Sequence, residues 1–147
     1  MGLFGFAALL FIVFIGLLIC LIPEIFFILT MQRALKRCAL ENQTMTPAST
    51  WLSLIPVFNL VWNFILVTQM AASLEREFKR RNIPVEPAPG KSIGLAWCIL
   101  VLGCLIPVLG ILSFIGALVC WVLYWVKIAG FSATLAVHTM GMQPVPV

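Results

Sequence analysis

The sequence predicts an all-α integral membrane protein, a single helical bundle with three to four membrane helices. Hydrophobic residues make up 63% of its 147 residues and charged residues only 10%, whereas soluble domains average about 45–50% and about 25%. The few charges are clustered between long apolar runs, as at helix ends on a membrane surface. Such a chain has too little polar surface to surround a core in water. We therefore expect its apolar surface to face a lipid bilayer.

The first apolar run begins at residue 3 and contains one charge, Glu24. We expect a helix over residues 3–38, long enough to span a bilayer with tilt. Pro23 lies inside it and predicts a kink. No Lys or Arg precedes Arg33, so the segment lacks the basic start of a cleaved signal peptide and is expected to stay as an anchor.

The second apolar run is expected to be a bent segment over residues 51–81. Pro56 and Asn59 stand in the order of a turn that leads into a helix, with Asn59 as the N-cap. A single helix is expected to follow, because no Gly or Pro interrupts it. The prolines of residues 84–90 then predict a stiff, non-helical linker.

The third apolar run predicts a helical hairpin over residues 92–137. As one helix its apolar part would be about 51 Å long, far more than the roughly 30 Å hydrocarbon core of a bilayer. Pro107 and Gly110 are the residues expected to open and close the turn. All these elements belong to one membrane domain, residues 1–147.

The basic residues decide the expected threading. Four plain spans would put the clusters that begin at Arg33 and Arg76 on opposite sides, which the positive-inside rule disfavours. If the bent segment enters the membrane and returns, all nine Lys and Arg face the cytoplasm. We therefore expect a multi-pass protein with its N-terminus outside and its basic loops cytoplasmic. Four conventional spans are the alternative.

Glu24 is the one acidic residue deep in an apolar run, where an ionisable group is costly unless it is partnered or protonated. It is interpreted either as a proton or cation site, or as a carboxylate that pairs near the interface or marks a subunit contact. Asn59, Asn63 and Gln69 are the amides expected to complete a candidate intramembrane polar site, with Lys127 a possible neighbour. If they form no such site, these three amides are expected to make hydrogen bonds between membrane helices.

A second candidate group is the basic flank that ends the bent segment. Its members are Arg76, Lys79, Arg80 and Arg81. Beside a membrane, these side chains are expected to attract anionic lipid headgroups and to report orientation.

The other chemistry-bearing residues predict packing. The five cysteines have no metal or redox spacing and are expected to pack as small soft residues. The tryptophans and Tyr124 are expected to form an interfacial belt, with a ligand cage as the alternative. Small residues spaced four apart suit close helix approach. These pairs are Gly16 with Cys20, Gly94 with Cys98, and Gly116 with Cys120.

The sequence contains no catalytic constellation, because Ser-His-acid, Cys-His and paired-carboxylate arrangements are missing and His138 stands alone. We expect no enzyme, cofactor or metal site, and no nucleic-acid binding, since no basic stripe carries accessible aromatics. The expected function is a non-catalytic accessory or structural subunit of a larger membrane assembly, or a homo-oligomer. The expected partners are the lipid bilayer and a membrane protein or second copy. The alternative is a small channel or transporter-like permeation unit that uses Glu24 and the Asn59/Asn63 corner.

A series of motifs carries a resemblance. They are Pro47-x-x-x-Trp51-Leu52-x-Leu54-Ile55-Pro56-x-Phe58-Asn59-x-x-Trp62-x-Phe64, Ser73-Leu74-x-x-Glu77-Phe78, Ser92-Ile93-Gly94 and Val119-Cys120-Trp121-x-x-Tyr124-Trp125-x-Lys127-Ile128. Over residues 47–131 the chain resembles a group of uncharacterised small bacterial membrane proteins, known as a domain of unknown function. The resemblance implies an all-helical membrane fold in a bacterial inner membrane and brings no activity or catalytic residues.

Overall fold

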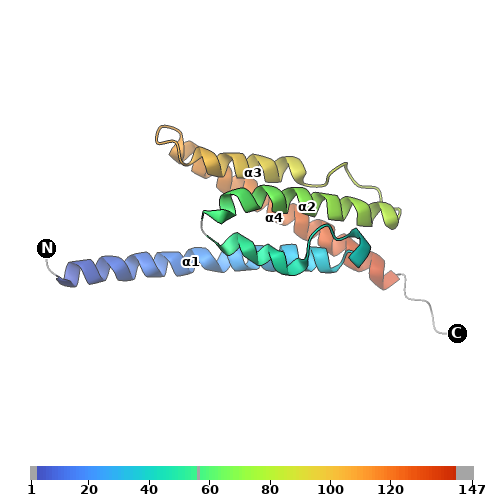
Figure 1. Ribbon diagram of the computed structural model, residues 1–147, viewed down its shortest axis with the longest axis horizontal. Coiled ribbons are helices and arrows are strands. Elements are labelled where there is room, and N and C mark those ends of the chain that lie inside the picture. The colour runs from blue at the N-terminus through green and yellow to red at the C-terminus, as the bar shows by residue number, and fades with distance from the viewer. Residues whose placement is uncertain (1–2, 56, 142–147) are drawn as a thin grey trace.

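The computed structural model of the chain describes residues 3–55 and 57–141, and helices dominate it (Figure 1). The elements are α1 (Leu3–Lys36), η1 (Leu40–Asn42), η2 (Pro47–Leu54), α2 (Phe58–Arg80), α3 (Lys91–Gly103) and α4 (Gly110–Gly141), where η denotes a 3-10 helix. No strand occurs in these described residues, so the predicted all-α class is confirmed.

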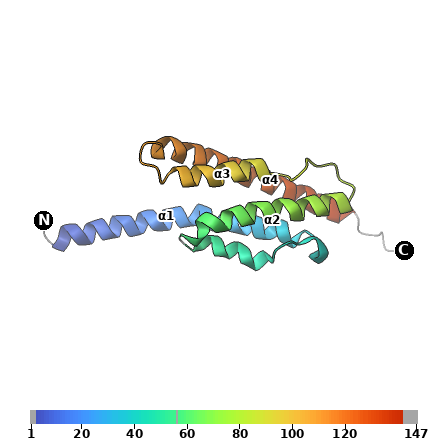
Figure 2. The ribbon, with the colours of Figure 1, turned by 45° about the horizontal axis from the view of Figure 1, so that its top comes forward.

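Helix α1 is continuous over 34 residues and passes through Pro23. Its two ends lie in different surroundings. Phe27, Ile28 and Met31 near the C-terminal end are fully buried, whereas side chains such as Phe11 near the N-terminal end are exposed. In both ribbon views the N-terminal part projects beyond the other helices (Figures 1 and 2).

The second segment is bent, and its two arms are η2 and α2. The amide of Asn59 donates to the carbonyl of Ile55 at 2.9 Å, and that of Leu60 to Val57 at 3.2 Å. Val57 has a positive φ of 66° and precedes α2, which begins one residue before Asn59 without a side-chain cap. The predicted cap at Asn59 is therefore wrong, because backbone carbonyls of the corner already accept the first amides. Pro56, predicted to open the corner, lies outside the described residues.

The third run folds as the hairpin of α3 and α4, whose connection is residues 104–109. The two helices lie side by side in both ribbon views (Figures 1 and 2). Glycines allow the close packing. A Cβ on Gly94 would lie 2.6 Å from Cγ1 of Val67 on α2, and one on Gly103 would lie 2.7 Å from Oγ of Ser113 on α4.

An aromatic cluster around Phe27 joins α1 to this hairpin. The Phe27 ring centroid lies 5.6 Å from Trp97, 5.7 Å from Trp121, 6.2 Å from Tyr124 and 6.3 Å from Trp125. Trp97 is 6% exposed and Tyr124 is 0% exposed. The predicted interfacial belt is therefore wrong for these two residues, because Trp97 on α3 and Tyr124 on α4 both pack against Phe27 of α1 and against each other.

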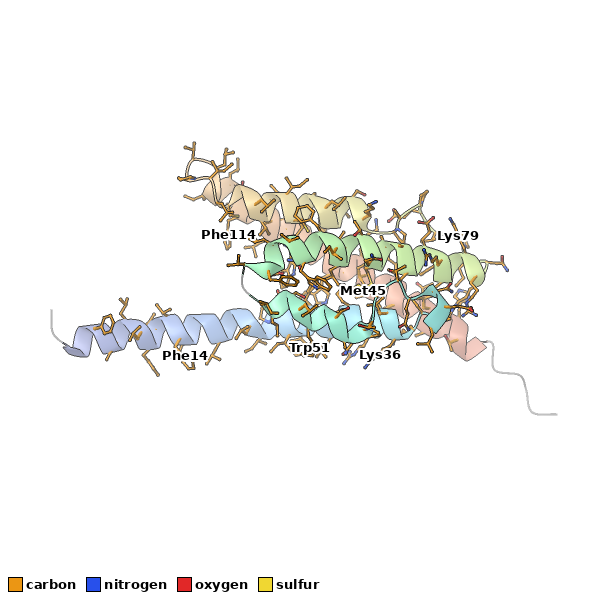
Figure 3. All side chains as sticks on the ribbon, viewed as in Figure 1. Phe14, Lys36, Met45, Trp51, Lys79 and Phe114 are labelled. Carbon is orange, nitrogen blue, oxygen red and sulfur yellow. The ribbon has the colours of Figure 1, made fainter. Side chains whose placement is uncertain are left out.

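The basic residues lie toward one end of the molecule, which is called the polar half below. Figure 3 shows Lys36 and Lys79 far from Phe14 and Phe114 along the long axis. The basic residues belong to the ends of α1 and α2, the start of α3 and the middle of α4: Arg33, Lys36, Arg37, Arg76, Lys79, Arg80, Arg81, Lys91 and Lys127. Two helices, over Gly5–Lys36 and Gly110–Thr139, are long and apolar enough to cross a membrane. The expected count of three to four spans is not confirmed by this result.

Candidate functional site

A pocket lies beside Glu24, between α1 and the α3–α4 hairpin. Its volume is about 440 Å³. The lining residues are Pro23, Glu24, Trp97, Val101, Cys104, Phe114, Ala117, Leu118 and Trp121. Except for the Glu24 carboxylate, the wall is apolar or aromatic, which is the usual composition of a small-molecule pocket with few polar groups.

Two polar groups in this pocket have no partner among the described residues. The Oε1 atom of Glu24 is buried and accepts no hydrogen bond, and the indole Nε1 of Trp121 is buried and donates none. Buried polar groups are nearly always hydrogen-bonded in folded proteins. Both atoms are themselves covered by protein, so they leave an unsatisfied acceptor and an unsatisfied donor in the wall of the pocket, and the Glu24 carboxyl group is the polar feature of that wall.

The predicted companions of Glu24 lie elsewhere. Asn59, Asn63 and Gln69 are on α2, and no α2 residue lines the pocket. The carboxamide oxygens of Asn59 and Asn63 are buried and have no hydrogen-bond partner among the described residues. The backbone carbonyl of Gln69 accepts from Thr44 Oγ1 at 2.8 Å. The structure therefore does not join Glu24 and the three amides into one site, because α1 packs mainly against α4 and η2.

Lys127 is not the partner of Glu24 either. Its Nζ lies 2.6 Å from Oε1 of Glu86, a residue of the linker. This pair joins the linker to α4 in the polar half.

Glu77, which the sequence suggested only as part of a resemblance motif and not as a site residue, binds Ala39, Asn42, Arg80 and Arg81 in the polar half, and this group is called the polar clamp. Its carboxylate is 0% exposed. Oε2 accepts from the amide of Ala39 at 2.9 Å and from Asn42 Nδ2 at 2.8 Å. Oε1 lies 2.6 Å from both Arg80 NH2 and Arg81 Nε. Burial acts to raise the pKa of Glu77, but the hydrogen bonds from Arg80, Asn42, Ala39 and Arg81 outweigh it and lower the pKa to about 2.

Arg81 extends the polar clamp to α1 and α4. Its NH1 donates to the Leu135 carbonyl at 2.9 Å and its NH2 to the Arg37 carbonyl at 2.9 Å. Arg37 in turn donates to the carbonyl of Ser132 at 2.6 Å. The clamp therefore ties the polar ends of α1, α2 and α4 together. A Glu followed by Arg at the third and fourth positions is the sequence signal that could have revealed it.

The polar clamp changes the interpretation of the basic flank. Arg81 is 9% exposed at its side chain and Arg80 pairs with Glu77. Lys79 pairs with Glu75 at 2.6 Å. Arg76 is exposed and has no ion pair within the described part of the chain. Three of the four flank cations are therefore paired within the protein, while Lys79 and Arg80 stay exposed beside their pairs, and the attraction of headgroups by the flank stays a prediction.

The His, Cys, Asp and Glu side chains of the described residues were the candidates for metal binding and thiol chemistry. The described residues contain no group of three or more His, Cys, Asp or Glu side chains that could hold a metal ion. Cys38 is buried, and burial together with the Glu77 carboxylate raises the pKa of its thiol to about 12. A thiol with that pKa is protonated at neutral pH and unreactive as a nucleophile. The side chain of Cys20 lies outside the described residues.

Comparison of the chain with family models, with curated proteins and with solved structures gave no match. The resemblance over residues 47–131 therefore stays a prediction.

Proposed function

We propose that this protein is a non-catalytic membrane subunit that associates through the N-terminal part of α1 with a second membrane protein or a second copy. The observation that carries the proposal is the excess apolar length of α1. Residues 3–32 contain Glu24 as their only charge and extend about 45 Å as a helix. Spanning the roughly 30 Å hydrocarbon core would need a tilt beyond the usual 0–40° range.

The register between α1 and α4 defines the part that projects. Trp125 donates to Thr30 and Arg37 donates to Ser132, and both pairs are 95 residues apart. The two helices therefore run parallel, and Gly110 at the start of α4 is level with residue 15, since 110 − 95 = 15. The projecting segment, residues 3–14, extends about 18 Å beyond the hairpin.

The projecting segment has no polar side chain, so it needs lipid or protein around it. The hairpin also needs lipid, because side chains such as Leu112 and Ile115 are exposed on it. The apolar arm of α4 up to Lys127 is about 26 Å long, which nearly fills the hydrocarbon core. A bilayer that covers the hairpin leaves the projecting segment to be covered by another protein.

The small residues of α1 support the same proposal. A Cβ on Gly94 would contact Val67, and one on Gly116 would lie 3.2 Å from Leu100, so these two glycines serve packing within the chain. A Cβ on Gly16 would meet nothing within 4 Å among the described residues. Its small surface is available to another helix.

The proposed threading is an N-terminus outside a bacterial inner membrane and all basic loops in the cytoplasm. The support for it is that the basic residues lie in one half of the molecule, because η2 and α2 run inward and return. A cysteine-free background with single cysteines at Leu40, Phe58, Pro87 or Val108 tests this. A membrane-impermeant maleimide should label Leu40→Cys and Pro87→Cys only from the cytoplasmic side, Val108→Cys from outside, and Phe58→Cys slowly from either side. Labelling of Pro87→Cys from outside would refute the threading.

Association is tested by truncating apolar side chains in two places. Phe11→Ala with Phe14→Ala changes the projecting segment, and Leu112→Ala with Ile115→Ala changes equally exposed positions on the hairpin. The wild-type chain, extracted from its own membrane in a mild detergent, should have a mass above that of the monomer by light scattering. We expect the Phe pair to weaken association about tenfold or more, and the hairpin pair to leave it unchanged.

Cross-linking in intact membranes provides a detergent-independent measurement. The mass of the cross-linked product distinguishes a second copy from a different subunit. Recovery of the wild type solely as a monomer in both measurements would refute the proposal, as would equal weakening by the two pairs of substitutions.

A further inference from the structure

The pocket beside Glu24 has a carboxyl group that no described cationic side chain pairs with. Neither of the two cationic side chains nearest in sequence to its lining, Lys91 and Lys127, is among the lining residues, and Lys127 is paired with Glu86. Glu24 forms no ion pair with any described residue. An ionised carboxylate in apolar surroundings is costly when it lacks a counter-ion, so a cation from outside the chain would be stabilised there.

Aromatic rings add a second attraction for the same kind of ligand. Trp97, Phe114 and Trp121 all line the pocket. The face of an aromatic ring attracts a cation placed within about 6 Å, and Trp is the strongest of the aromatic side chains in this respect. The Trp121 ring is held by its neighbours, with its centroid 5.7 Å from Phe27 and 5.3 Å from Trp125.

The volume of the pocket and its aliphatic lining indicate how large the apolar part of the ligand is. A volume of about 440 Å³ lies within the range of about 300–1,000 Å³ that is usual for small-molecule sites. Val101, Ala117 and Leu118 contribute apolar surface. A hydrated inorganic cation would leave this surface uncovered, whereas an organic cation with apolar substituents would cover it.

We propose that this pocket binds a lipophilic organic cation, an apolar molecule with an ammonium or phosphonium charge, with Glu24 as its counter-ion. The cation lies against the carboxylate and the faces of the aromatic rings, while its apolar substituents contact the aliphatic wall. This binding activity is separate from the association through the projecting segment, and it does not depend on that association.

Equilibrium dialysis of the purified full-length protein with radiolabelled tetraphenylphosphonium tests the proposal. Glu24→Gln removes the charge with little change in shape. Glu41→Gln is the matched control, because Glu41 is exposed on η1 and forms no ion pair with a described residue. We expect saturable binding of one cation per chain, a loss of affinity of about tenfold or more in Glu24→Gln, and no change in Glu41→Gln.

Two further comparisons distinguish the contribution of the Glu24 charge to affinity from that of the aromatic rings. Neutral triphenylphosphine oxide should bind wild type and Glu24→Gln equally weakly. Trp121→Phe should retain more affinity for the cation than Trp121→Leu, since only Phe keeps a ring. Equal affinity of wild type and Glu24→Gln, or equal binding of the neutral probe and the cation by wild type, would overturn the proposal.

A chemical measurement on the wild-type protein avoids dependence on how the variants fold. Dicyclohexylcarbodiimide is an apolar reagent that modifies carboxyl groups in apolar surroundings, and mass spectrometry locates the modified residue. Tetraphenylphosphonium should slow modification of Glu24 at least severalfold, and triphenylphosphine oxide should not. Unchanged modification at saturating cation would also overturn the proposal. A protein that remains monomeric but is protected by the cation would refute only the proposed association.

Discussion

Replacing Glu77 by Gln should destabilise the bundle more than any other conservative change in the polar half. The carboxylate accepts hydrogen bonds from Ala39, Asn42, Arg80 and Arg81. A carboxamide offers only one acceptor oxygen, and its NH2 group would face donors. The substitution therefore breaks part of the polar clamp and leaves the Arg81 guanidinium, 9% exposed, without its buried counter-ion.

The magnitude follows from this burial. Removing one partner of a buried ion pair costs about 3–5 kcal/mol, because the remaining charge stays desolvated and unpaired. Part of that cost is offset where the amide oxygen still accepts from one arginine. Hydrogen bonds to charged groups are worth about 1.5–3 kcal/mol each, so we expect Glu77→Gln to lower the free energy of unfolding by about 3 kcal/mol.

Unfolding by sodium dodecyl sulfate in mixed maltoside micelles, followed by tryptophan fluorescence, measures this change. Glu75→Gln is the matched control: Glu75 lies two residues before Glu77 on the other side of α2, pairs with Lys79, whose side chain is 72% exposed, and accepts from the Ala88 amide at 3.1 Å, a bond that a glutamine oxygen can also accept. Exposed pairs contribute little to stability, so this control should unfold at the wild-type detergent fraction. Equal unfolding midpoints for Glu77→Gln and Glu75→Gln would refute the polar clamp as a source of stability.

Two further predictions concern acid and packing. The pKa of Glu77 is lowered to about 2 from its usual 4.5. Its contribution to stability is therefore complete above about pH 4.5 and is lost as the pH falls towards 2. The detergent fraction at which the wild type unfolds should decrease in this pH window, and that of Glu77→Gln should decrease less. Gly94→Ala places a Cβ 2.6 Å from Val67 Cγ1 and should cost about 1–3 kcal/mol by overpacking. Gly130→Ala, whose Cβ would meet no described atom within 4 Å, should unfold no more easily than wild type, because alanine favours a helix over glycine. Equal midpoints for the two glycine variants would contradict the close approach of α2 and α3.

The helical class and the positions of the breaks could be predicted from the sequence. An apolar run in lipid has to satisfy its own backbone hydrogen bonds, and a helix does so within one segment. Pro and Gly together interrupt that pattern locally, so the turn between α3 and α4 falls at residues 104–109, where Pro107 was expected to open it, whereas the single Pro23 leaves α1 continuous. The clustering of charges likewise indicated which helix ends lie together.

The contacts made by individual side chains could not be predicted in the same way. Asn59 fails as a cap because the backbone of the corner accepts the first amides. Glu24 lies at a pocket formed with α3 and α4 and not beside the amides of α2. The first outcome depends on the backbone conformation of the corner, and the second on which helix packs against each face of α1.

By itself the sequence determined the helices, their breaks and the concentration of charge, because each follows from local composition. Only the tertiary structure decided which faces meet: that Trp97 and Tyr124 are core residues, and that Glu77 is the centre of the polar clamp while Glu24 lies unpaired in an apolar pocket. The physical reason is that the protein interior and the lipid are both apolar. A membrane helix such as α1 therefore has no polar stripe to show which side faces its neighbours.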